Sequence, residues 1–90
     1  MRKSFEITFL PRFDKSFMKL SEELSGKFMG FLYEFEKDPF SPKFKTNKLQ
    51  GPLREYYALR ISYSCRAIFR IEGSKITFID IGGHDIYKTN

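Results

Sequence analysis

The 90-residue sequence predicts an α+β fold of order β-α-α-β-β-β, in which an antiparallel sheet carries two helices on one face. Three patterns support this fold class. Apolar and polar residues alternate near the N-terminus, apolar residues then recur at helical spacing, and the second half holds three β-branched or aromatic runs. No repeat or linker interrupts the chain, so we expect a single domain over residues 1–90.

The first strand is predicted over residues 4–10. Phe5, Ile7 and Phe9 alternate with polar side chains there, and Pro11 ends the run. These three side chains should therefore share one face of the sheet.

The helices are predicted between Pro11 and the Asp38-Pro39 pair, because a proline disfavours helix at the residue before it. Apolar residues from Phe13 to Phe35 recur there at spacings of three and four, which indicates one buried helical face. Ser21, followed by two glutamates, is a candidate N-cap. We expect two helices that meet near Ser21, with one continuous helix as the alternative.

The remaining strands are predicted over residues 56–61, 64–71 and 75–81, after a loop at residues 39–46 that is rich in turn formers. The sequence Glu72-Gly73-Ser74 supplies the turn between the last two strands. These strands complete the predicted sheet.

Positive charge is concentrated in one part of the chain. The net charge is +5, but residues 1–40 are neutral, residues 41–70 carry +6 and residues 71–90 carry −1. Such a segment either solubilises the domain or faces a polyanion such as nucleic acid or an acidic partner. The basic residues of this segment are Lys43, Lys45, Lys48, Arg54, Arg60, Arg66 and Arg70.

Strand alternation assigns sides to part of this charge. In the strand over residues 64–71, Cys65, Ala67 and Phe69 should face the helices, whereas Arg66 and Arg70 should face the uncovered side. Arg60 of the preceding strand can join them. The arginines there either bind phosphate or extend over a solvated sheet.

Two chemically distinctive residues occur once each. Cys65 excludes an intramolecular disulfide, and with His84 as the single histidine the sequence lacks the ligands of an ordinary metal site. We therefore expect no metal and no cofactor. His84 follows Gly82-Gly83 at the end of the last strand, where it is a candidate acid or base near neutral pH. No run is apolar and long enough for a membrane span, and we expect a cytoplasmic protein with no membrane partner.

Four stretches of the chain form a recognisable series: Asn47-Lys48-Leu49-Gln50-Gly51, Tyr56-Tyr57-Ala58-Leu59-Arg60, Cys65-Arg66-Ala67-Ile68-Phe69-Arg70-Ile71 and Ile79-Asp80-Ile81-Gly82-Gly83-His84-Asp85-Ile86-Tyr87. In this order and spacing they resemble the RelE/ParE toxin superfamily of bacterial toxin–antitoxin systems, most closely the mRNA interferases of the RelE and YafQ type.

The resemblance implies a RelE-like microbial ribonuclease fold that binds mRNA in the ribosomal A site and cleaves it with the RNA 2′-hydroxyl as nucleophile. It implies a catalytic set in which Lys48 contacts phosphate or helps activate the 2′-hydroxyl, Arg66 stabilises charge on the phosphate, His84 protonates the leaving oxygen and Tyr87 stacks on or orients a base. The expected RNA-binding residues are Lys43, Lys45, Lys48, Arg54, Arg60 and Arg70. The expected partners are mRNA, the ribosome and a cognate antitoxin that holds the enzyme inactive.

Two other functions remain open at this point. A ParE-like toxin would bind DNA gyrase and cleave no RNA, although such chains generally lack the set Lys48, Arg66, His84 and Tyr87. The other alternative is a non-catalytic module that binds RNA or protein.

Overall fold

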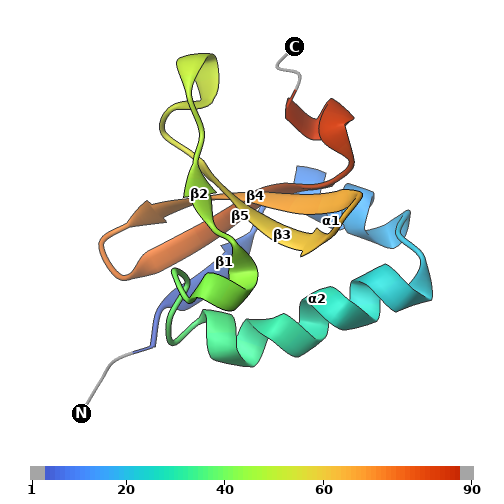
Figure 1. Cartoon of the computed structure of the whole chain (residues 1–90), viewed down its shortest axis with the longest axis horizontal. Coiled ribbons are helices and arrows are strands. Elements are labelled where there is room, and N and C mark those ends of the chain that lie inside the picture. Colours follow the sequence, from blue (N-terminus) through green and yellow to red (C-terminus); the bar gives the residue numbers. More distant parts are fainter. Residues whose placement is uncertain (1–3, 88–90) are drawn as a thin grey trace.

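A computed structural model describes residues 4–87, except the side chain of His84. The described chain contains two helices, five strands and three short 3₁₀ turns (Figure 1). In chain order they are β1 (Glu6–Phe9), α1 (Pro11–Met18), α2 (Glu22–Phe35), η1 (Pro42–Phe44), β2 (Asn47–Lys48), η2 (Gly51–Leu53), β3 (Tyr57–Ser62), β4 (Cys65–Glu72), β5 (Lys75–Gly82) and η3 (His84–Tyr87). Neither helix has the length and apolar character that crossing a membrane requires.

The strands form one sheet in the order β1-β5-β4-β3-β2. All neighbouring strands are antiparallel except β1 and β5, which run parallel with Glu6 opposite Lys75. The predicted α+β fold is confirmed, and the sheet is mostly antiparallel. The structure adds the two-residue strand β2 and the parallel pairing of β1, which joins segments about 70 residues apart.

The prediction of two helices is confirmed. The hydroxyl of Ser21 accepts a hydrogen bond from the backbone N–H of Leu24 at 3.2 Å, so Ser21 is the N-cap of α2. The helix ends at Phe35, a few residues before the predicted stop at Asp38-Pro39. The aromatic face of both helices thus turns toward the sheet.

The core between helices and sheet is built largely from phenylalanine. Phe28 of α2 contacts Phe78 of β5 with ring centroids 5.2 Å apart, and Phe35 contacts Phe69 of β4 at 5.1 Å. All four rings are at most 1% exposed. Cys65 is buried in the same core, as the alternation of β4 predicts.

An irregularity in the register between Ile68 and Phe69 of β4 changes the alternation along β5. Phe78 and Ile81 both face the core, whereas Asp80 turns toward α1. Its carboxylate accepts hydrogen bonds from Arg12 Nε at 3.0 Å and from the hydroxyl of Ser16 at 2.5 Å. Asp80 thus ties α1 to the sheet, a cross-layer contact that strand periodicity does not predict.

Candidate nucleic-acid interface

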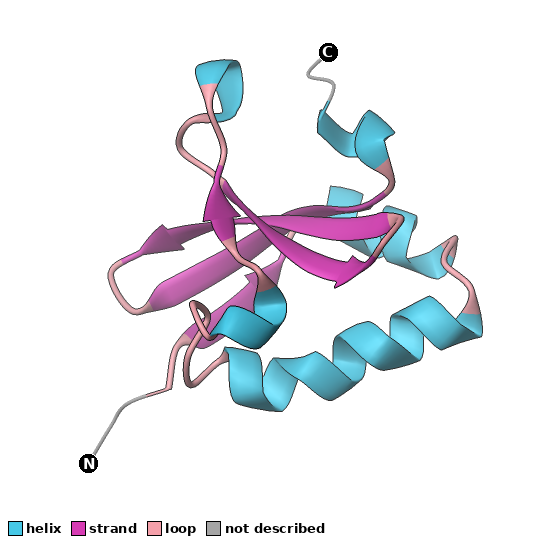
Figure 2. Ribbon diagram, in the orientation of Figure 1, coloured by secondary structure: helices cyan, strands magenta, loops and turns pink. Residues whose placement is uncertain are grey.

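The sheet face that α1 and α2 leave uncovered is bordered by two projecting segments. Figure 2 shows α2 below the sheet, and η2 and η3 on the opposite side. The first segment, residues 49–56, leaves β2 and returns to β3. The second, residues 83–87, continues from β5 and contains η3. We call this the open face.

Arg60 and Arg66 are directly opposite each other on β3 and β4, and both point to the open face. Arg66 donates a hydrogen bond from Nη1 to the backbone oxygen of Tyr63 at 3.3 Å, and the Arg60 guanidinium lies 5.8 Å from the centre of the Tyr63 ring. Within residues 4–87 neither arginine has a carboxylate partner. Two positive charges on paired residues of neighbouring strands repel each other, and an anion bound between them would remove this repulsion.

Tyr87 is held beside this pair by the turn after β5. Gly82 has a φ of 156°, and a Cβ there would lie 2.9 Å from Cγ2 of the buried residue Ile86. Glycine at position 82 therefore lets η3 pack closely over the end of the sheet. Burial raises the pKa of the Tyr87 phenol, and the nearby positive charge of Arg66 partly offsets this effect. The hydroxyl of Tyr87 is thus protonated at neutral pH.

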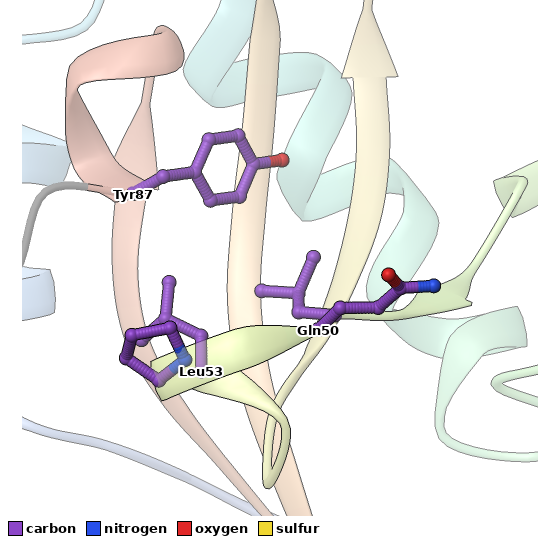
Figure 3. Close-up of a pocket in the computed structure, with 5 residues that line it drawn as sticks. Gln50, Leu53 and Tyr87 are labelled. Atoms are coloured by element: carbon purple, nitrogen blue, oxygen red, sulfur yellow. The ribbon is translucent and has the colours of Figure 1, made fainter.

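A cavity of about 320 Å³ lies between the two projecting segments (Figure 3). Tyr87 lines it from η3, and Gln50 and Leu53 line it from the segment around η2. Leu49 and Pro52 complete the lining, so that an aromatic ring and aliphatic side chains form most of the wall. Such a wall suits a flat apolar group such as a nucleobase.

Lys48 lies on the other side of the sheet from Arg66. The register places it opposite Tyr57, whose ring stacks on the core residue Phe69. Its Nζ atom lies 5.5 Å from the centre of the Tyr57 ring. Because neighbouring strand residues point to opposite faces, Leu49 and not Lys48 reaches the cavity. The structure therefore brings Arg60, Arg66 and Tyr87 together but not Lys48.

The other basic residues form separate groups. Arg54, directly after η2, donates to the backbone oxygen of Gly51. Lys43 forms an ion pair with Glu34 of α2 at 2.5 Å. Nε of Arg70 lies 3.7 Å from Oε1 of Glu72 and is buried without a hydrogen bond. The positive charge of residues 41–70 is thus distributed over both sides of the sheet.

Sequence reasoning gave no role to the cavity residues Leu49, Pro52 and Leu53. The signal lay in the stretch Leu49-Gln50-Gly51, because a turn there lets these side chains face the C-terminal tyrosine. The side chain of His84 lies outside what the structure describes. Its backbone belongs to η3, as does that of Tyr87.

Comparison with known proteins gives structural matches only. No protein-family model matches the sequence, and no curated protein is similar to it. Among solved structures, a chain of the RelBE2 toxin–antitoxin complex from Mycobacterium tuberculosis superposes with a TM-score of 0.77 at 13% identity, covering 91% of this chain and 100% of that one.

Two further matches are similar. RelE–RelB from the archaeon Pyrococcus horikoshii gives a TM-score of 0.74 at 19% identity over 90% of this chain and 96% of that one. YoeB from Staphylococcus aureus gives 0.74 at 20% identity over 91% and 99%. The chain therefore has the fold of the RelE and YoeB toxins.

Proposed function

We propose that this protein is the toxin of a toxin–antitoxin system and that it cleaves mRNA on the ribosome. The observation that carries the proposal is the pair Arg60 and Arg66 on the open face, without carboxylate partners among the described residues and next to the Tyr87 cavity. Two guanidinium groups can hold a phosphate while the adjacent base enters the cavity. The matched structures, which include toxin–antitoxin complexes, support the toxin role.

In the proposed reaction the 2′-hydroxyl of the RNA attacks the neighbouring phosphorus. The bond to the 5′-oxygen breaks, which leaves a cyclic phosphate on one product and a 5′-hydroxyl on the other. Arg66 stabilises the negative charge that grows on the phosphate, and His84 gives a proton to the leaving oxygen. Tyr87 orients the base. Because the nucleophile belongs to the RNA, this scheme needs no nucleophilic side chain.

Lys48 enters the proposal as a phosphate contact at the sheet edge. Its position beside Tyr57, on the face away from Arg66, separates it from the reacting phosphate and argues against a role as general base. The 2′-hydroxyl proton then passes to a group of the ribosome or the RNA. The same proposal gives this chain a cognate antitoxin, as in the RelBE2 and RelE–RelB complexes.

Expression in bacteria followed by primer extension tests the function. The substrate is one message in two forms, translated and with its start codon destroyed, and the control is the Arg66→Ala variant. Cuts in the translated form alone, absent with the variant, are expected. Growth arrest without cuts would instead indicate a gyrase-directed toxin, and neither effect would leave a binding module.

A further inference from the structure

The turn between β3 and β4 carries an exposed aromatic side chain, that of Tyr63. The pairing register shifts between Arg60 and Ser62, so that β3 holds one residue more there than β4, which is the signature of a β-bulge. The two-residue turn Tyr63-Ser64 follows directly after this bulge. Tyr63 is 85% exposed, more than Tyr33 of α2, which is 67% exposed. The chain therefore presents an aromatic ring to solvent close to the open face.

Tyr63 contacts both Arg60 and Arg66, which we call the arginine pair. The backbone oxygen of Tyr63 accepts a hydrogen bond from Nη1 of Arg66 at 3.3 Å. The Arg60 guanidinium lies over the Tyr63 ring, 5.8 Å from its centre. A cation at this distance from an aromatic ring is weakly attracted to it where solvent reaches both groups. The ring thus lies beside the arginine pair, with most of its surface available to another flat group.

Tyr63 and Tyr87 belong to different parts of the surface. Tyr87 lines the cavity beside η2, whereas Tyr63 lines a second pocket of about 270 Å³ together with Lys27 and Lys45. No residue lines both of these pockets. Arg66 adjoins both tyrosines, because it bonds to the Tyr63 backbone and because its charge offsets part of the rise that burial causes in the pKa of Tyr87. The arginine pair therefore lies between two aromatic side chains.

We propose that Tyr63 stacks on an RNA base, that of the nucleotide across the cleaved phosphate from the base in the Tyr87 cavity. This inference rests on the proposed function, which supplies the RNA. The arginine pair holds the phosphate between the two nucleotides, and each neighbouring base meets one tyrosine. Lys27 and Lys45, which have no carboxylate partner among the described residues, attract the phosphate that follows.

The surroundings of Tyr63 favour a nucleotide over an apolar protein side chain. A nucleotide joins a flat base to a phosphate, which matches an exposed ring beside the two guanidinium groups. An apolar side chain would cover the ring but leave the cations unpaired. Because every base has a flat face, stacking on Tyr63 gives affinity and fixes the position of the strand without selecting a sequence. Base selectivity then belongs to the Tyr87 cavity.

The test uses the full chain and a fluorescent RNA of about four nucleotides, in which 2′-fluoro groups replace the 2′-hydroxyls so that binding is measured without cleavage. Fluorescence anisotropy gives the affinity of the wild type and of Tyr63→Ala, Tyr63→Leu and Tyr63→Phe. The matched control is Tyr33→Ala. Tyr33 is also exposed and has a cation over its ring, Lys37 Nζ at 3.9 Å, but it belongs to α2 on the covered side of the sheet (Figure 2).

Tyr63→Ala and Tyr63→Leu should weaken binding roughly 5- to 100-fold, as expected for the loss of one stacked base. Tyr63→Phe, which keeps the ring, and Tyr33→Ala should bind like the wild type. Urea unfolding should be the same for all, because both tyrosines are exposed. A second series of RNAs lacks one base at a time. Loss of the base that stacks on Tyr63 should weaken wild-type binding but leave Tyr63→Ala almost unaffected, the coupling that a double-mutant cycle detects.

Equal affinity of the wild type and Tyr63→Ala, or equal losses for Tyr63→Ala and Tyr63→Phe, would overturn the proposal. It would also be overturned if the wild type bound none of these RNAs, or if no missing base showed coupling to Tyr63. These results are independent of the nuclease assay. Cleavage of mRNA without such coupling would remove the role of Tyr63 and leave the proposed function, whereas coupling without cleavage would keep the stacked base and remove the nuclease.

Discussion

Replacement of Arg66 by alanine should abolish most of the activity and leave the fold intact. Arg66 of β4 lies opposite Arg60 of the neighbouring strand β3 and has no carboxylate partner among the described residues, so its charge is available to a phosphate. Loss of one preorganised charge-stabilising group typically lowers a rate roughly 100- to 1,000-fold. Because removal of Arg66 also relieves repulsion of about 0.2–1 kcal/mol between facing like charges, the free energy of unfolding should not fall.

Arg70 is the matched control because it lies on the same face of β4. Its guanidinium is already close to the carboxylate of Glu72, at 3.7 Å, and it is farther along the strand from Tyr87. Arg70→Ala should reduce cleavage by less than about fivefold, in keeping with the modest value of partly exposed ion pairs. The assay is the cleavage rate of a ribosome-bound message under single turnover, with urea unfolding of each variant. Equal losses for both variants would refute specific phosphate binding at Arg66 and indicate a general basic surface.

Three further predictions concern the scaffold. Gly82→Ala should reduce cleavage and lower the free energy of unfolding by about 1–3 kcal/mol, because the new Cβ would lie 2.9 Å from Ile86. In the control Gly83→Ala the new Cβ meets nothing closer than 3.6 Å, so urea unfolding should change little. Phe28→Ala removes a ring that is 1% exposed and should cost about 3–5 kcal/mol in urea unfolding, whereas Met29→Ala, on the exposed side of the same helix, should cost less than about 0.5 kcal/mol. Burial raises the pKa of the Cys65 thiol, so the unfolded chain loses this proton at lower pH than the folded one. The free energy of unfolding should therefore fall as pH rises through the alkaline range, and Cys65→Ala should flatten that fall.

The parts of the fold that depend on local pattern could be predicted from the sequence. Apolar spacing identified the helical face that carries Phe28 and Phe35, and the cap at Ser21 separated the two helices. Strands β3, β4 and β5 differ from the predicted ranges by at most one residue at each end. These features are encoded over a few residues, where periodicity and turn chemistry act.

Other features depend on long-range pairing. The two residues of β2 are too few for a periodic signal, and the parallel pairing of β1 with β5 joins the two ends of the chain. The side taken by Lys48 follows from the register of β2 against Tyr57. A shift of one residue would turn it to the other face. A motif can therefore indicate Lys48 as a functional residue without showing which surface it joins.

The charge pattern illustrates the same limit. Alternation correctly placed Arg66 on the face of β4 away from the core, because side chains along a strand point to its two faces in turn. Lys43 and Lys45 precede β2 in a segment without periodicity, and tertiary packing places both of them with Lys27 of α2 around one surface pocket. The net charge of the segment was compatible with solubilisation or with a polyanion partner, and it did not show that the cations would form separate surfaces.

The most direct test of ribosome-dependent cleavage is a reaction of purified components. The purified chain is mixed with a defined message, either free or bound to ribosomes that hold a chosen codon in an empty A site. The products are mapped to single-nucleotide resolution. Cleavage within the A-site codon of the ribosome-bound message, with no cleavage of the free message and little with Arg66→Ala, is the predicted result. Equal cleavage of the free message, or no cleavage of either, would contradict the account.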